Sequence, residues 1–266
     1  MSDSKSKKIA VVTGASAGIG AVYAERLAAR GYDLILVARR AERLEALSAK
    51  ISKIHGRQVE VIGADLTKEA DLARVEKILA TDPAVRVLVN NAGNAKLGPV
   101  ARTSAEDAAS MIALNITALT RLTQAVLPAF LSRNAGVIVN VGSVLSFHSL
   151  PVSSIYSGTK GYVLNFSRGI QEELAGTGVR LQLVLPASTA TELWDLSGVP
   201  LAALNQDTVM TSEDLVDAAL SGFDKGEAIT LPSVADASLW GTYDAARSAL
   251  FAATQTGKPA PRYKAS

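Results

Sequence analysis

The sequence predicts an α/β fold: a doubly wound, mainly parallel sheet of seven strands with helices on both faces. Short apolar runs alternate along the chain with longer segments in which apolar residues recur every three or four positions. The apolar runs are continuous rather than alternating, which is what burial on both faces of a parallel sheet requires. We therefore expect a ligand site where the carboxyl ends of the strands meet.

Each strand is predicted from a short run that is rich in β-branched residues or leucine. These runs cover residues 9–12, 34–37, 59–62, 85–89, 136–141 and 179–185, with a weaker candidate at 228–231. Helical spacing predicts helices at residues 19–30, 42–54, 71–79, 105–131, 155–174, 212–223 and 236–254. Residues 187–210 break this rhythm and are rich in Pro, Ser, Thr and Ala, so we expect a lid or substrate loop there.

Composition narrows the class of protein. The 266 residues are 48% hydrophobic and 20% charged, which fits one globular domain over residues 1–266. The formal net charge is +2 without a basic cluster, so we expect no nucleic-acid partner. Cysteine is absent and there are two histidines, so we expect no disulfide and no metal site. No signal region and no apolar run of about eighteen residues is present, so we expect a cytoplasmic protein with no membrane partner.

The first strand runs straight into a glycine-rich turn, TGASAGIG, and then into a helix. Gly14, Gly18 and Gly20 let the chain turn sharply and let bare backbone approach a diphosphate. Ser16 and Ile19 lie between them, where the helix amino terminus offers unpaired N–H groups and a partial positive charge. A plain tight turn has the same pattern, but the position after the first strand favours a dinucleotide-binding loop.

A pair of arginines follows the second strand. A dinucleotide fold that uses NAD usually carries an acidic residue there for the ribose hydroxyls, whereas this chain has Ala38, Arg39 and Arg40. The helix dipole disfavours cations at a helix amino terminus, so a nearby anion would account for the pair. The 2′-phosphate of NADP is the favoured anion, and we expect NADPH to be preferred over NADH. The alternative is a solvated pair with Glu42 and Glu45 as partners.

A tyrosine and a lysine stand four residues apart in the predicted helix 155–174. Tyr156 and Lys160 share a stripe with later core positions, so Lys160 is expected to point inward. A free phenol has a pKa of about 10, and an ammonium about 4 Å away would lower that pKa toward neutrality. We therefore expect Tyr156 to act as general acid and base, with Ser143 donating to the substrate oxygen. The alternative is a core tyrosine beside a snorkelling lysine.

These motifs occur together and in order: TGASAGIG, NNAG at 90–93, Asn115, Ser143, and Tyr156 followed by Lys160. Over residues 9–191 the chain resembles the short-chain dehydrogenase/reductase family. The resemblance implies a Rossmann-like fold, a nicotinamide cofactor and a catalytic tetrad of Asn115, Ser143, Tyr156 and Lys160. It further implies that Asn115 holds a water linking Lys160 to solvent, and that Lys160 also holds the nicotinamide ribose.

The resemblance also assigns further cofactor contacts. They are Asp65 and Leu66 at the adenine, Asn91 and Gly93 beside the cofactor, and Thr189 and Thr191 at the carboxamide and diphosphate. Taken alone, Asp65 fits equally well as a helix cap and Asn91 as a turn residue. One departure is Ala187 after Pro186, where the family commonly has glycine, and it removes backbone freedom before the two threonines.

The substrate side of the expected site is mainly apolar. Its residues by position are Asn94, Lys96, residues 145–150 and the lid residues 193–201, while the roles of His148 and Trp194 stay open. We expect an NADP-dependent oxidoreductase that moves hydride between the nicotinamide and a carbonyl or secondary alcohol of a moderately apolar small molecule. Two alternatives are a 3-oxoacyl-thioester reductase and a non-catalytic NADP-binding sensor or scaffold. The resemblance also implies a homodimer or homotetramer formed through the helices containing residues 118–131 and 155–174.

Overall fold

The computed structural model describes residues 7–263, so the ends of the predicted domain at 1–6 and 264–266 lie outside the described residues. Its sheet has seven parallel strands in the order β3-β2-β1-β4-β5-β6-β7. The strands are β1 (Ile9–Thr13), β2 (Asp33–Ala38), β3 (Val59–Gly63), β4 (Val85–Asn90), β5 (Gly136–Val141), β6 (Val179–Val184) and β7 (Ile229–Thr230). The strand order reverses between β1 and β4, which confirms the predicted doubly wound, Rossmann-like class.

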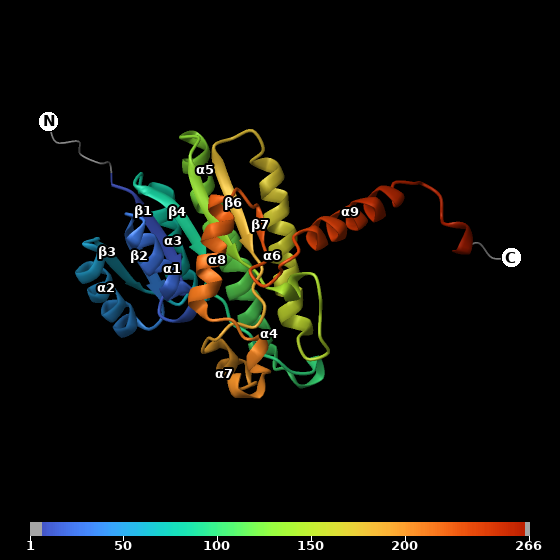
Figure 1. The fold of residues 1–266 in the computed structure, drawn as a ribbon, viewed down its shortest axis with the longest axis horizontal. Helices are drawn as coiled ribbons and strands as arrows, with labels where there is room; N and C mark the ends of the chain where they lie inside the picture. The colour runs from blue at the N-terminus through green and yellow to red at the C-terminus, as the bar shows by residue number, and fades with distance from the viewer. Residues whose placement is uncertain (1–6, 264–266) are drawn as a thin grey trace. The chain divides into compact units, whose positions relative to one another are not determined.

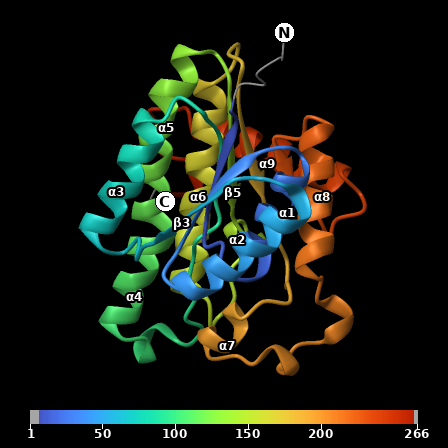
Figure 2. The same cartoon turned by 90° about the vertical axis from the view of Figure 1, so that its left-hand side faces the viewer.

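Helices cover both faces of this sheet, as Figure 1 and Figure 2 show. They are α1 (Gly18–Ala29), α2 (Ala41–His55), α3 (Glu69–Thr81), α4 (Ala105–Ile112), α5 (Leu119–Ser132), α6 (Ser154–Glu173) and α8 (Ser212–Asp224). On one face α1 packs against α2 and α8, and on the other α3 packs against α5 while α6 packs against β6. Each predicted strand is thus present, and so are the predicted helices other than 105–131 and 236–254, with shifts of a few residues at the ends.

Two apolar cores lie on the two faces of the sheet. Ala10 and Val12 of β1 belong to one core, whereas Ile9 and Val11 of the same strand belong to the other. Successive side chains of a strand point to opposite faces. Because both faces are covered, every position of β1 must be apolar or small, which explains the continuous apolar runs.

The predicted helix 105–131 is divided into three segments. A π-helical stretch, Ala113–Ala118, separates α4 from α5 and contains the buried Asn115. A π turn adds one residue between hydrogen-bonded partners and changes the direction of the side chains that it carries. Helical spacing continues on both sides of such a turn, so the sequence pattern does not reveal it.

The expected lid at residues 187–210 is a loop that also contains a short helix. This helix, α7, covers Leu193–Ser197, and two single 3₁₀ turns follow at Leu201–Ala203 and Gln206–Thr208. An isolated parallel bridge joins Thr189 to Met210. The two ends of the loop are therefore tied together beside the sheet.

A buried polar network joins the middle of the sheet to the helices behind it. Asn90 donates to Asn140 and to Thr123 of α5, each at 3.0 Å, and Asn140 donates to Ser167 of α6 at 2.9 Å. A buried hydrogen bond is stronger at low dielectric, and a broken one leaves a costly unpaired group. The network therefore holds β4 and β5 at fixed positions relative to α5 and α6.

The chain divides into two compact units, Met1–Pro232 and Ser233–Ser266. The first holds the sheet and the helices described above. The second contains α9 (Ser238–Ala253), close to the predicted 236–254 helix, and no residue within α9 is buried. Among residues 7–263, no helix is both long and apolar enough to cross a bilayer. The single domain over 1–266 stays a prediction.

Candidate active site

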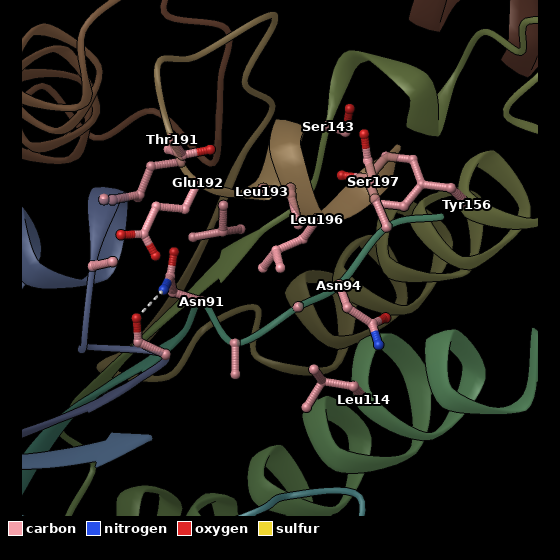
Figure 3. A pocket seen from close by; sticks show the side chains of 18 of the residues that line it. Asn91, Asn94, Leu114, Ser143, Tyr156, Thr191, Glu192, Leu193, Leu196 and Ser197 are labelled. Atoms are coloured by element: carbon pink, nitrogen blue, oxygen red, sulfur yellow. Dashed lines mark hydrogen bonds between the residues drawn. The ribbon is translucent and has the colours of Figure 1, made fainter. Parts of the chain in front are cut away.

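A cavity of about 1000 Å³ opens at the carboxyl ends of the central strands. It is lined by segments that follow β1, β2, β3, β4, β5 and β6, together with residues of α4, α6 and α7. Of the predicted catalytic and cofactor-binding residues, Gly20 and Asn115 stand behind the lining and all the others contribute to it. Figure 3 shows Ser143 and Tyr156 at one side of this cavity and Thr191 and Glu192 at the other.

The glycine turn needs its glycines for conformation and for space. Gly14 and Gly18 have φ angles of +67° and +52°, which side-chain-bearing residues adopt rarely. A Cβ added to Gly20 would lie 2.4 Å from the carbonyl oxygen of Gly14, which no real contact allows. The first turn of α1 must therefore pack directly on the loop, leaving backbone rather than side chains at the cavity.

Asn91 locks this turn to the neighbouring strand. Its Nδ2 donates to the carbonyl oxygens of Thr13 at 3.0 Å and Gly14 at 3.2 Å, and its N–H donates to Thr13 Oγ1 at 3.0 Å. A structural role at a turn, the alternative considered for Asn91, is thus present together with its place in the cavity wall.

The residues at this end fit a dinucleotide diphosphate. The N-cap position of α1 is Ala17, and within residues 7–263 no side chain caps the helix. The first-turn N–H groups of a helix lack intrahelical partners and carry a partial positive charge. Because bare backbone and an uncapped helix amino terminus meet at the cavity wall, an anion can reach these donors.

The two arginines after β2 have different surroundings. Arg39 is exposed and, among the described residues, makes no hydrogen bond or ion pair. Arg40 donates from Nε and Nη2 to Ser16 at 3.3 and 3.1 Å and from Nη1 to Glu192 at 2.6 Å. Glu42 and Glu45, considered as alternative partners from the sequence, do not pair with either arginine.

Asp65 is not a helix cap, because the N-cap residue of α3 is Lys68; it stabilises the turn before that helix, and its adenine contact stays a prediction. Its Oδ1 accepts from the N–H of Thr67 at 3.0 Å and from Thr67 Oγ1 at 2.7 Å, as a turn residue does. Burial raises the pKa of the Asp65 carboxyl, but the Thr67 hydrogen bonds and the charges of Arg39 and Lys68 lower it overall. Asp65 and the buried Leu66 both line the cavity beside Arg39.

At the reactive end, Lys160 points inward as predicted and is 6% exposed. Its Nζ donates to the carbonyl oxygen of Val141 at 2.9 Å and lies 5.7 Å from the centroid of the Tyr156 ring. Burial lowers the pKa of Lys160 to about 8. The ammonium is therefore held at the end of β5 and over the face of the ring.

The expected shift of the Tyr156 pKa is wrong for this arrangement. Burial raises the pKa of Tyr156 to about 12, and a hydrogen bond with Ser143 lowers it only in part. The sequence-based expectation placed the ammonium against the phenol, but the hydrogen bond to Val141 holds it elsewhere. Desolvation of the phenolate therefore outweighs the attraction of the lysine.

Asn115 is buried behind the cavity and hydrogen-bonded on both sides of its amide. Its Oδ1 accepts from the N–H of Asn94 at 2.9 Å, and its Nδ2 donates to the carbonyl of Asn94 at 2.9 Å and to Thr159 at 3.1 Å. A Cβ on Gly93 would lie 3.2 Å from Asn115 Oδ1 and 3.8 Å from Lys160 Nζ. The π turn thus brings Asn115 close to Lys160, while the implied water stays a prediction.

The segment after β6 forms the lid side of the cavity. Thr189 and Thr191 both line it, and Thr191 packs against Gly18, where an added Cβ would lie 2.9 Å from Thr191 Cγ2. Trp194 donates from Nε1 to the carbonyl of Thr189 at 2.9 Å, which ties α7 to the first residues of the same loop. Lys96 and His148, by contrast, are exposed and lie outside the cavity lining.

Several lining residues were not singled out from the sequence. Glu192 is one, because nothing local distinguishes it from a surface glutamate. Others come from the α4 region, where the helical pattern alone does not show which face meets the cavity; they are Glu106, Ala109, Ser110, Ala113 and Leu114. Within the described chain, no group of three or more His, Asp or Glu side chains gathers as metal ligands.

Comparison with known proteins gives the chain a family and close structural relatives. Residues 8–198 match the family model described as short chain dehydrogenase. A very-long-chain 3-oxoacyl-CoA reductase from Danio rerio is 37% identical over 70% of this chain and 61% of its own length. The chain thus spans about 60% of the length of the curated relatives it matches.

Two solved structures resemble almost the whole chain. A short-chain dehydrogenase from Sphingobium yanoikuyae in complex with NADPH is 46% identical, with a TM-score of 0.94 over 97% of this chain and 100% of that one. The bulky-bulky ketone specific alcohol dehydrogenase from Comamonas testosteroni is 39% identical, with a TM-score of 0.89 over 98% of this chain and 100% of that one.

Stability should depend on pH through Lys160. Its folded-state pKa of about 8 lies below the value of about 10.4 in an unfolded chain, so the unfolded chain holds more protons between these values. The free energy of unfolding should therefore rise from pH 8 to pH 9.5, by at most about 1.4 kcal/mol per pH unit. Urea unfolding at several pH values in this range measures the rise. The range stays below the pH at which ionisation of Tyr156 adds to the pH dependence of stability.

In Lys160→Met the rise should disappear, because no proton is then gained on unfolding. The control is Lys53→Met, which removes an exposed lysine from α2 and should keep the wild-type profile. A flat wild-type profile, or an undiminished rise in Lys160→Met, would contradict the assignment.

Proposed function

The chain belongs to the short-chain dehydrogenase family, and from this we propose that it is an NADP-dependent oxidoreductase of carbonyl compounds and secondary alcohols, with Tyr156 as general acid and base. The observation that carries the proposal is the meeting of two sites in one cavity. The glycine turn with its uncapped helix lies at one end, and Ser143 and Tyr156 lie together at the other.

The residues of the reactive end have distinct roles in this proposal. A bound nicotinamide dinucleotide supplies or accepts the hydride. Tyr156 gives a proton to the substrate oxygen in reduction and takes it back in oxidation, because its hydroxyl is the acidic group beside Ser143. Ser143 donates a hydrogen bond to the substrate oxygen and so keeps that oxygen next to the Tyr156 hydroxyl. The Lys160 side chain is fixed by its hydrogen bond to the carbonyl of Val141. When Lys160 is protonated, its positive charge therefore stays near the Tyr156 hydroxyl and the substrate oxygen.

The preference for NADPH rests on Arg39. Among the described residues Arg39 makes no salt bridge or hydrogen bond, although its charge acts on Asp65, and it lines the cavity beside Asp65 and Leu66. A guanidinium that is free and planar can bind a phosphate through two N–H groups. The NADPH held by the Sphingobium relative supports this preference, although it is a property of that protein.

The substrate proposed is a moderately apolar ketone, aldehyde or secondary alcohol. The cavity beside Tyr156 is bordered by leucines from four segments: Leu97, Leu114, Leu145, Leu150, Leu193 and Leu196. Such a lining favours apolar groups on both sides of the reacting carbon. The name of the Comamonas relative, a bulky-bulky ketone specific enzyme, supports the same class.

A second candidate is reduction of a 3-oxoacyl thioester. The similarity to a 3-oxoacyl-CoA reductase over 70% of this chain favours it. A screen of free ketones and alcohols beside 3-oxoacyl-CoA esters, with NADPH or NADP, separates the candidates. Turnover of the free carbonyls supports the first, and turnover of the thioesters alone supports the second. Cofactor binding without any turnover would favour the sensor or scaffold alternative.

The expected homodimer or homotetramer and the cytoplasmic location stay predictions.

Replacing Tyr156 by Phe should reduce turnover by at least about a thousandfold, because the proton donor is lost while the ring remains. NADPH affinity should stay within a few fold, measured by cofactor fluorescence. Tyr162→Phe, six residues further along α6 and exposed, is the matched control and should keep its turnover. Retained turnover in Tyr156→Phe would refute the acid–base role.

Replacing Arg39 by Asp should weaken NADPH binding by at least about tenfold and leave NADH binding nearly unchanged. The change puts a carboxylate where a phosphate is proposed to bind, and close like charges repel. Lys53→Asp makes the same charge change at the far end of α2 and should alter neither affinity. An unchanged preference for NADPH over NADH in Arg39→Asp would overturn the phosphate assignment.

A further inference from the structure

An ion-pair bridge crosses the rim of the cavity between the lid and the start of α2. Glu192 Oε2 accepts from Arg40 Nη1 and Glu192 Oε1 accepts from Arg43 Nη1, both at 2.6 Å. The carboxylate is thus shared by two guanidinium groups that lie one helical turn apart. The bridge joins segments that are 152 and 149 positions apart in the sequence.

The bridge leaves Arg40 with little free hydrogen-bonding capacity toward the cavity. Its Nη1 is engaged by Glu192, and its Nε and Nη2 both point to Ser16 in the glycine turn. Arg39, the adjacent residue, is exposed and has no such partner among the described residues. The sequence pattern does not distinguish Arg39 from Arg40. In the structure they differ, because within residues 7–263 Arg39 has unpaired N–H groups for a ligand anion and Arg40 has few.

The same carboxylate also belongs to the lid. Glu192 is the N-cap residue of α7, whose Leu193 and Leu196 line the cavity. Figure 3 shows these two leucines between Glu192 and the Ser143–Tyr156 side of the pocket in that view. The contact of Glu192 with Arg40 and Arg43 is therefore connected through α7 to the part of the cavity where the substrate is proposed to bind.

We propose that Glu192 competes with the 2′-phosphate of the cofactor for Arg40, and that it thereby limits the preference for NADPH while fastening the lid to α2. This inference rests on the proposed function, because it concerns how the same cavity selects its dinucleotide. The incoming phosphate replaces Glu192 as the hydrogen-bond partner of Arg40. Glu192 keeps its second hydrogen bond, the one from Arg43.

Charge and exposure make this exchange feasible. Glu192, Arg40 and Arg43 are 46%, 38% and 45% exposed, so their pairing is screened by water and is weak enough to break. A 2′-phosphate carries nearly two negative charges and would be repelled by a carboxylate left on the same guanidinium. NADH has only a hydroxyl at this position and gains nothing from displacing Glu192.

The first test measures NADPH and NADH dissociation constants of Glu192→Gln by fluorescence titration at low salt. NADPH should bind about three- to tenfold more tightly than to the wild type, and NADH affinity should stay within about twofold. Asp195→Asn removes one negative charge from the same short helix without contacting the arginines, and should leave both constants unchanged. Unchanged or weaker NADPH binding in Glu192→Gln overturns the inference, as does an equal gain in Asp195→Asn.

A double variant shows whether the effect passes through Arg40. The gain in NADPH affinity from Glu192→Gln should vanish when it is made in an Arg40→Gln background. A gain that persists there would mean that Glu192 acts by general repulsion, which overturns the competition. If the wild type binds neither NADPH nor NADH, the proposed function itself fails. That outcome differs from one in which both bind and Glu192→Gln changes neither affinity, which overturns only the competition.

The lid part of the inference has its own readout. In the absence of nucleotide, limited proteolysis should cleave Glu192→Gln within residues 187–210 at least about threefold faster than wild type. Asp195→Asn should be cleaved at the wild-type rate. Equal rates for all three proteins would overturn the claim that the bridge fastens the lid.

Discussion

Burial of the sheet on both faces is the constraint on which the rest of this chain depends. Because α1, α2 and α8 cover one face and α3, α5 and α6 cover the other, most side chains within the strands are apolar. Polar groups at the cavity therefore stand mainly where the strands end. Since all seven strands run in one direction, those ends meet along one edge, and the cavity opens there.

Backbone atoms, more than side chains, set the positions of the polar groups at this edge. Lys160 is held by the carbonyl of Val141, Asn115 by the peptide groups of Asn94, and Asn91 by the carbonyls of Thr13 and Gly14. A backbone partner moves only when its strand or loop moves. Lys160 is thereby tied to β5, Asn91 is tied to the end of β1, and the Asn90–Asn140 network joins β4 to β5 behind the site.

The two ends of the cavity differ in their electrostatics. At the outer rim, the charges of Arg40, Arg43 and Glu192 are exposed by more than a third and are screened by solvent. At the inner end, Lys160 is buried, its pKa is lowered by burial, and its field acts at low dielectric. Contacts at the rim can exchange partners readily, whereas those at the inner end are held in one arrangement.

Local patterns of residue type and spacing predict the alternation of strands and helices, the glycine turn and the candidate residues Ser143, Tyr156 and Lys160. The fold decided features that no local pattern shows: the Lys160 ammonium bonds to Val141, the Tyr156 pKa is raised, and Asn115 stands in a π turn. It also decided that Arg40 meets Glu192, 152 positions away. These features depend on which atoms of distant segments meet and on how much water remains between them, and neither is written in local spacing.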